Sequence, residues 1–135
     1  MNTSDTAVFF YGLFMDPEVL LSMGVEPPEG QAVSLPDYAL HIGKRATLAP
    51  SSGGRVFGML YQLSAMDLEH LYGAPGLEDY RPETVQVVTP TGAMIKACCY
   101  NLPTTPAADE SNPTYLAQLK ATLNKLGLPD VIGPD

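Results

Sequence analysis

Proline and glycine divide this chain into short apolar runs, and this division constrains the fold more than any other feature. The sequence contains 13 Pro and 12 Gly. Short apolar runs with turn residues at both ends are typical of β-strands. The expected strands are Ala7–Tyr11, Ala32–Ile42, Arg55–Leu63, Glu83–Val88 and Ala93–Tyr100, with Arg45–Ala49 as a further short extended piece. Turns are expected at Pro50–Gly54 and Pro90–Gly92, and the second turn indicates a hairpin.

Three segments carry helix signals instead, namely an N-cap residue, an apolar face and a residue that stops the helix. They follow the caps Asp16, Ser64 and Asn112, and they end before Gly24, at Tyr72 and at Leu126. The last helix is the clearest, because Leu116, Leu119, Leu123 and Leu126 are spaced as one helical face. Strands outnumber helices and do not alternate with them, which indicates the α+β class rather than a doubly wound sheet.

Composition is that of a single globular domain over residues 1–135, in which we expect residues 1–6 to be flexible. The net charge of 7 − 15 = −8 repels phosphate backbones and anionic membranes. We therefore expect neither nucleic acid nor a membrane as a partner. The sequence shows no signal-peptide pattern and no apolar run of the roughly 20 residues that a membrane helix needs. A cytoplasmic location is the resulting expectation.

The pattern of cysteine and histidine residues does not indicate a metal or a cofactor. Cys98 and Cys99 are neighbours, so on a strand one thiol points into the core and the other points outside. This spacing suits neither a mutual disulfide nor a metal site. His41 and His70 have no ligand partners at a suitable spacing, and they are interpreted as packing or surface residues.

Two stretches, Val8–Met15 and Leu71–Arg81, carry a resemblance to a known family. The first contains Tyr11-Gly12 at the end of an expected strand, and the second contains Gly76 followed by Tyr80-Arg81. In this order the stretches resemble the γ-glutamylcyclotransferase-like family. The resemblance implies a small mixed β-barrel with helices packed outside and no cofactor. It also implies a 5-oxoproline-forming activity on γ-glutamyl compounds, with a small molecule as the partner.

The resemblance also implies where the substrate pocket lies. In the family, the loop after the first strand presents backbone N–H groups to the substrate. The substrate-binding candidates are accordingly Tyr11, Gly12, Leu13, Phe14, Gly76 and Tyr80. Arg81 is interpreted as a surface partner of nearby acids such as Glu83.

Pro75 occupies the position that the resemblance assigns to the catalytic Glu of the family. Proline has no titratable side chain, so general acid–base chemistry there would be lost. Glu78 is the nearest carboxylate that could replace it, and it is the one catalytic candidate. Two interpretations stay open: a divergent cyclotransferase that uses a relocated carboxylate, and a non-catalytic binding or interaction module on the same fold. The sequence does not determine the oligomeric state, and a homodimer stays open.

Overall fold

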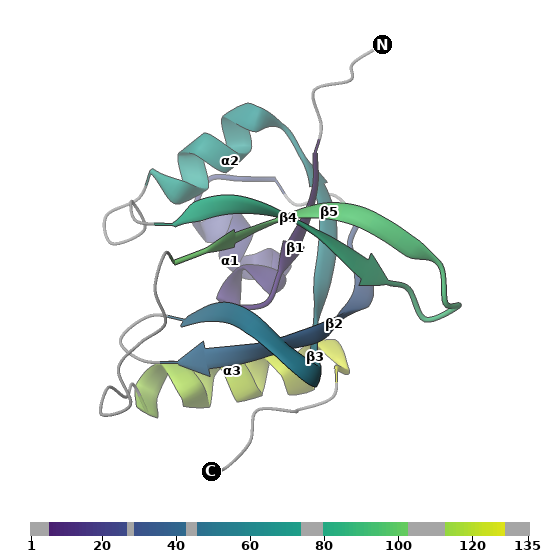
Figure 1. Ribbon diagram of the computed structural model, residues 1–135. Coiled ribbons are helices and arrows are strands. Elements are labelled where there is room, and N and C mark those ends of the chain that lie inside the picture. Colours follow the sequence, from purple (N-terminus) through teal and green to yellow (C-terminus); the bar gives the residue numbers. More distant parts are fainter. Residues whose placement is uncertain (1–5, 27–28, 43–45, 74–79, 103–112, 129–135) are drawn as a thin grey trace.

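The computed structural model describes residues 6–26, 29–42, 46–73, 80–102 and 113–128. The expected strands form a closed barrel in the order β1-β3-β2-β4-β5 (Figure 1). The strands are β1 (Thr6–Phe10), β2 (Gln31–Ile42), β3 (Ala46–Leu63), β4 (Arg81–Val88) and β5 (Met94–Asn101). Neighbouring strands are antiparallel except for β1 and β5, which close the barrel in parallel. The small mixed barrel of the α+β class is confirmed.

Two of the five junctions between strands are narrow. The hairpin of β4 and β5 pairs eight residues on each strand, from Arg81 with Asn101 to Val88 with Met94. By contrast, a single residue pair, Ser34 with Val88, joins β2 to β4. A single pair, Val8 with Cys98, also joins β1 to β5. Strand pairing therefore joins the hairpin to β1 and to β2 through one residue pair each.

The expected turn at Pro50–Gly54 is wrong as a chain reversal, because β3 runs through it without a break. Tyr38 pairs with Pro50 and Pro36 pairs with Arg55, so residues 51–54 lie opposite the single residue Asp37. Asp37 has a φ of 66°, and its Oδ1 accepts a hydrogen bond of 3.1 Å from the N–H of Gly53. The turn residues thus form an irregularity inside a long strand, and the two expected pieces of β3 are one element.

The helices lie outside the barrel (Figure 1). The first two begin at the expected caps Asp16 and Ser64, and the third expected cap, Asn112, lies outside the described residues. The helices are α1 (Pro17–Ser22), α2 (Ala65–Tyr72) and α3 (Pro113–Leu126), with a short 3₁₀ turn, η1 (Leu13–Met15), ahead of α1. Asp16 accepts a hydrogen bond from the N–H of Glu18 at 2.9 Å, and Ser64 accepts one from Asp67 at 3.1 Å. Both side chains satisfy N–H groups that the first turn of a helix leaves without partners.

Alternating side chains on β1 separate two hydrophobic cores. Phe9, and Tyr11 just after the end of β1, point into the barrel together with Leu35, Leu60 and Val87. Val8 and Phe10 point outward, against the helices. Their core also contains Leu20, Leu63, Leu68, Leu71, Leu119 and Leu123. Cys99 is buried inside the barrel and Cys98 is only partly buried, as the sequence predicts.

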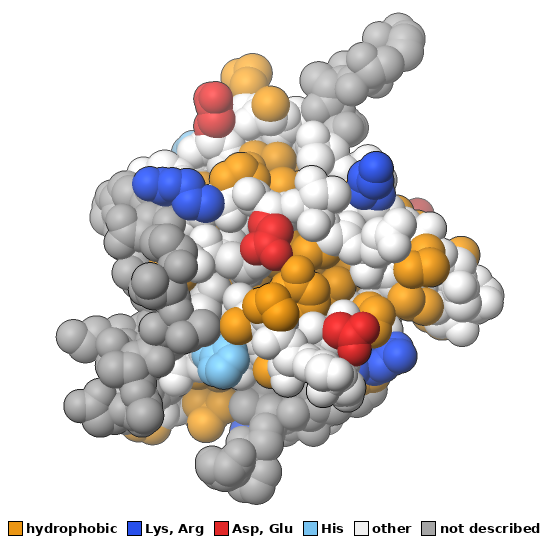
Figure 2. Space-filling model, viewed as in Figure 1, with side chains coloured by type: hydrophobic (Ala, Val, Ile, Leu, Met, Phe, Trp, Pro, Cys, Tyr) orange, Lys and Arg blue, Asp and Glu red, His pale blue; other side chains and the backbone are white. Residues whose placement is uncertain are grey.

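Charged side chains are scattered over the face shown in Figure 2, and the Lys and Arg side chains on that face stand apart from one another. Hydrophobic side chains gather near the middle of the same face. Among the helices that the structure describes, none combines the length and the apolar character needed to cross a membrane.

Candidate functional site

Two tyrosine hydroxyls meet at one end of the barrel. Tyr11 follows β1, and its hydroxyl donates to the carbonyl of Tyr100 at 2.8 Å and approaches the carbonyl of Ala46 at 3.5 Å. Tyr80 lies just before β4, and its hydroxyl also donates to the carbonyl of Ala46. The end of β1 and the beginnings of β3 and β4 are thereby held together.

The ring of Tyr72, at the end of α2, is the centre of an aromatic group at this end. It stacks on Tyr100 with ring centroids 4.1 Å apart and an angle of 14° between the planes. Phe14 in η1 meets Tyr72 edge-on at 5.8 Å, and Tyr80 lies against it at 5.9 Å. Phe14 and Tyr80, which are far apart in the sequence, are therefore brought to the same ring.

Gly12 lies close to Tyr115 of α3. A Cβ atom at Gly12 would lie 2.5 Å from the hydroxyl of Tyr115, closer than such atoms normally approach, so glycine permits this contact. The carbonyl of Gly12 accepts a hydrogen bond of 3.0 Å from the N–H of Met15, which closes the turn of η1. Leu13 belongs to this turn through its backbone.

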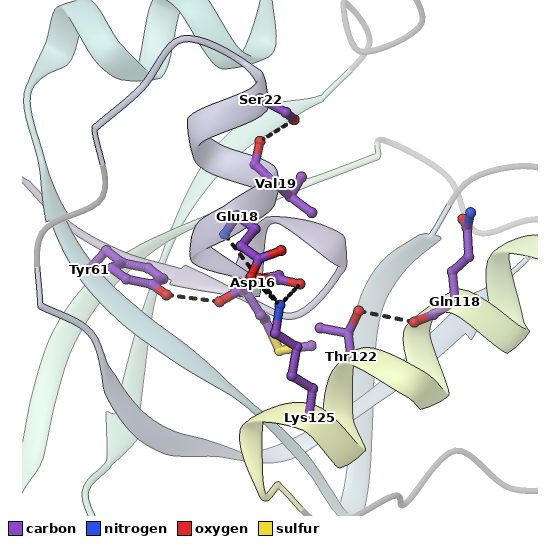
Figure 3. Close-up of polar contacts among 9 residues, drawn as sticks. Asp16, Glu18, Val19, Ser22, Tyr61, Gln118, Thr122 and Lys125 are labelled. Carbon is purple, nitrogen blue, oxygen red and sulfur yellow. Dashed lines mark hydrogen bonds and ion pairs between the residues drawn. The ribbon is translucent and has the colours of Figure 1, made fainter.

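Polar contacts on both sides fix the position of η1 and α1, as Figure 3 shows. The hydroxyl of Tyr61 on β3 donates to the carbonyl of Met15 at 2.8 Å. Lys125 near the end of α3 binds both carboxylate oxygens of Asp16 at 3.0 Å, and it lies 3.3 Å from Glu18. The segment that follows Gly12 is thus anchored to β3 and to α3.

The phenols of this site are donors and not bases at neutral pH. Burial raises the pKa of both Tyr11 and Tyr72 well above the ordinary value for tyrosine. The neighbouring Cys99 and Tyr80 raise the pKa of each phenol further. A phenol that stays protonated can donate a hydrogen bond to a ligand, but it cannot remove a proton from one.

A network around Glu83 lies at the junction between β2 and β4. The carboxylate accepts hydrogen bonds from the hydroxyl of Tyr38 at 2.9 Å and from Nδ2 of Asn101 at 3.0 Å. Oδ1 of Asn101 in turn accepts a hydrogen bond of 3.2 Å from the N–H of Leu48. Burial, followed by the bond to Glu83, raises the pKa of Tyr38 to about 12. Side-chain hydrogen bonds therefore link β2, β3, β4 and β5 at a place where the backbones of β2 and β4 are not paired.

A hollow of about 520 Å³ lies beside the aromatic group, between α2 and the strands β1 and β5. Tyr72 and Tyr100 form part of its wall, together with Leu68, Glu69 and Cys98. Gly12 and Tyr80 do not line it. Its volume is within the range of small-molecule sites.

The family model for gamma-glutamyl cyclotransferase, AIG2-like proteins matches residues 8–118. The chain belongs to this family. No curated protein sequence matches the chain at a significant level.

Solved structures share the cyclotransferase fold of the chain. An uncharacterized human protein has a TM-score of 0.78 and 21% identity, with 98% of this chain and 90% of that chain covered. A structure described as Gamma-glutamyl cyclotransferase has a TM-score of 0.77 and 21% identity, with coverage of 97% and 89%. A yeast cyclotransferase described as specific to glutathione has a TM-score of 0.66 and 13% identity, with coverage of 95% and 90%. At these identities the likeness shows the fold alone.

The candidates that the family resemblance suggested fall into two groups. Tyr11, Phe14 and Tyr80 take part in the contacts described above, and Gly12 and the backbone of Leu13 lie beside them. Pro75, Gly76 and Glu78 lie outside the described residues, as does the side chain of Leu13.

The remaining residues that the sequence singled out lie at the surface. Arg81 is exposed, and its Nη1 donates to the carbonyl of Tyr80 at 3.2 Å. His41 and His70 are exposed, and Nε2 of His70 lies 2.6 Å from the carbonyl of Met23. Within the part of the chain that the structure describes, no group of three or more His, Cys, Asp or Glu side chains is arranged to hold a metal ion.

Sequence reasoning missed Tyr72, Tyr100, Tyr115 and the pair Glu83 and Asn101 as members of this end of the family fold. The available signal was the tyrosine content, since the chain has seven Tyr and no Trp. Apart from Tyr38 and Tyr61, all of these tyrosines belong to the aromatic end of the barrel. An excess of one amphipathic residue type is compatible with a shared site, because tyrosine combines an apolar ring with a polar tip.

Proposed function

We propose that this chain binds a γ-glutamyl compound, or a related small amino-acid derivative, at the aromatic end of its barrel. The observation that carries the proposal is the meeting of Phe14 and Tyr80 on the ring of Tyr72. These two residues come from the two segments to which the family resemblance assigns the pocket. The names of two structural relatives, the cyclotransferase and the yeast protein specific to glutathione, support this class of ligand.

We also propose that cyclotransferase activity is absent or very weak. The reason is the assignment of the catalytic position to Pro75, because general acid–base assistance typically contributes about 10²–10⁴-fold to a rate. Tyr11 and Tyr72 do not replace the base, because the raised pKa of each phenol keeps it protonated at neutral pH. A pocket without a base retains the advantage of holding the substrate folded, but it lacks a group to move the proton.

The second candidate function is a non-catalytic binding or interaction module on the same barrel. It is favoured by the same substitution, Pro75, and by the contacts of the aromatic group. The hydroxyls of Tyr11 and Tyr80 donate hydrogen bonds to backbone carbonyls, so these contacts hold the barrel end together without a bound ligand. If activity is found in spite of Pro75, Glu78 is the residue that we propose as the relocated base.

The proposed partner is a small molecule, and neither nucleic acid nor a membrane is proposed. The net charge of −8 and the separated basic side chains in Figure 2 support this choice, because phosphate backbones and anionic lipids require clustered cations. A cytoplasmic location is part of the same proposal.

Isothermal titration with γ-glutamyl-alanine, glutathione and 5-oxoproline tests the binding proposal. We expect saturable binding of at least one of them. Tyr80→Phe should lose about three- to tenfold in affinity, because it removes the hydrogen bond to the Ala46 carbonyl that holds this end of the barrel together, and one hydrogen bond is worth about 1 kcal/mol. Tyr38→Phe is the matched control, because it removes a phenol hydroxyl outside the aromatic group. Unchanged affinity in Tyr80→Phe, or an equal loss in both variants, would contradict the proposed position of the site.

Release of 5-oxoproline tests the catalytic part separately. We expect no turnover above background in the natural chain and a gain in Pro75→Glu, if the remaining site is intact. Turnover by the natural chain at a rate typical of enzymes would show that our interpretation of Pro75 is wrong. In that case, loss of the activity in Glu78→Gln, with the fold retained, would show that the base has moved along the segment.

A further inference from the structure

A second hollow, of about 480 Å³, lies between β2, β3, the turn of the β4–β5 hairpin and the end of α3. Its lining includes Val33, Ser34, Arg55, Phe57, Thr89 and Leu128. The hairpin turn and the C-terminal end of α3 lie on the same side of the barrel in Figure 1. The hollow shares no lining residue with the aromatic group or with the first hollow.

Arg55 gives this hollow a positive charge that no acid among the described lining residues balances. Its Nη1 donates to Oγ of Ser34 at 2.7 Å, and no Asp or Glu is among the described residues that line the hollow. No ion pair joins Arg55 to a carboxylate of the described segments, although the chain carries 15 acidic residues. The remaining guanidinium donors are therefore available to an anion, and their planar arrangement matches a carboxylate.

Ser34 adds a second donor in a protected position. The residue is 5% exposed, and its oxygen accepts the bond from Arg55. Within the described segments, no group accepts a hydrogen bond from the Ser34 hydroxyl. A buried hydroxyl whose oxygen already accepts a bond has its proton available for an acceptor on a ligand.

The other lining side chains are largely apolar. Val33 and Leu128 are buried, while Phe57 and Val88 are partly exposed at the hollow. A ligand that suits both parts has a carboxylate at one end and a hydrocarbon body at the other. The volume is within the range of small-molecule sites, so a free acid suits it better than a folded partner.

We propose that this hollow is a binding site for a small apolar carboxylic acid, whose carboxylate is held by Arg55 and Ser34 and whose hydrocarbon chain lies against Phe57, Val88 and Leu128. The site is separate from the aromatic end of the barrel, so it does not depend on the function proposed there.

Titration of ¹⁵N-labelled protein with sodium octanoate tests the proposal by two-dimensional NMR. We expect saturable amide shifts at Ser34, Arg55 and Phe57. Octanol, which lacks the charge, and acetate, which lacks the chain, should each bind at least tenfold more weakly than octanoate. No shift in this region, or equal binding of octanol, would overturn the proposal.

Charge variants complete the test. Arg55→Gln is expected to weaken octanoate binding at least tenfold, and Ser34→Ala should weaken it several-fold. Lys96→Gln is the matched control, since it removes one positive charge from an exposed position on β5 that does not line the hollow. Equal losses of octanoate affinity in Arg55→Gln and Lys96→Gln would show that net charge alone explains the effect, and would overturn the assignment. Binding of inorganic phosphate or of a peptide C-terminus, without binding of octanoate, would also overturn it.

Discussion

Replacing Asp16 separates two roles that the structure gives to one carboxylate. It is the N-cap of α1, and it also binds Lys125 through both oxygens (Figure 3). Asp16→Ala removes both roles, whereas Asp16→Asn keeps a cap acceptor and removes the charge. Loss of the cap alone costs about 1 kcal/mol, which corresponds to a fall of roughly 2–6 °C in melting temperature for a domain of this size.

The pH dependence of this contribution follows from the sign of the pKa shift. Burial raises the pKa of Asp16, but the hydrogen bonds from Lys125 and from the N–H of Glu18 outweigh burial and leave the pKa below its ordinary value. A carboxylate with a lowered pKa in the folded state stabilises that state above the unfolded pKa of about 3.9. This stabilisation is lost as the pH falls through the lower, folded pKa.

Urea unfolding of the natural chain, Asp16→Asn and Asp16→Ala at pH 7 and pH 3 is the appropriate assay. We expect Asp16→Ala to be the least stable at pH 7, and the gap between the natural chain and Asp16→Asn to narrow at pH 3. In a Lys125→Met background, the effect of Asp16→Asn should shrink, because the partner of the charge is already absent. Equal stability of all three proteins at pH 7, or a gap that widens at pH 3, would refute this reasoning.

Three further predictions follow from packing. Leu119→Ala should lower the free energy of unfolding, measured by urea titration, by about 2–5 kcal/mol, because the side chain is fully buried. Gln118→Ala is the control, and it should change this free energy little because Gln118 is exposed. Gly12→Ala should destabilise the chain through the contact with Tyr115, and a Tyr115→Phe background should recover part of the loss in thermal unfolding. A thiol reagent should modify Cys98 before Cys99 in the native protein, because burial raises the pKa of the Cys99 thiol more than that of the Cys98 thiol. Peptide mapping would detect the order of modification.

Local signals predicted much of the fold because the structures that they specify are themselves local. Asp16 and Ser64 cap helices through N–H groups two and three residues away. The hairpin at Pro90–Gly92 needs only a turn with Gly92, whose φ is 93°. The turn at Pro50–Gly54 misled the prediction because its meaning depends on Asp37, which lies opposite it on another strand. A bulge partner cannot be identified from the turn sequence alone.

The candidate site was only partly predictable for the same physical reason. Tyr11 and Phe14 were found because they stand within one recognisable stretch of sequence. Tyr72, Tyr100 and Tyr115 join them only after α2, β5 and α3 pack against the barrel, and no spacing in the chain encodes that contact. The role proposed for Arg55 was unpredictable for the same reason, because the hollow that it lines is formed by four separate elements whose described lining residues include no acid.

The single residue pairs beside the β4–β5 hairpin have a consequence for how the molecule opens. The hairpin has many hydrogen-bonded residue pairs within itself and few to the neighbouring strands. Such a unit is expected to unfold locally as one cooperative segment. We therefore expect amide hydrogens of β4 and β5 that bond across the two narrow junctions to exchange with solvent sooner than those within β2 and β3. Both hollows cross these junctions: one is lined by Thr6 and Cys98, the other by Ser34 and Val88. A ligand bound in either hollow would connect the hairpin to the rest of the barrel, and slower exchange at that junction would reveal it.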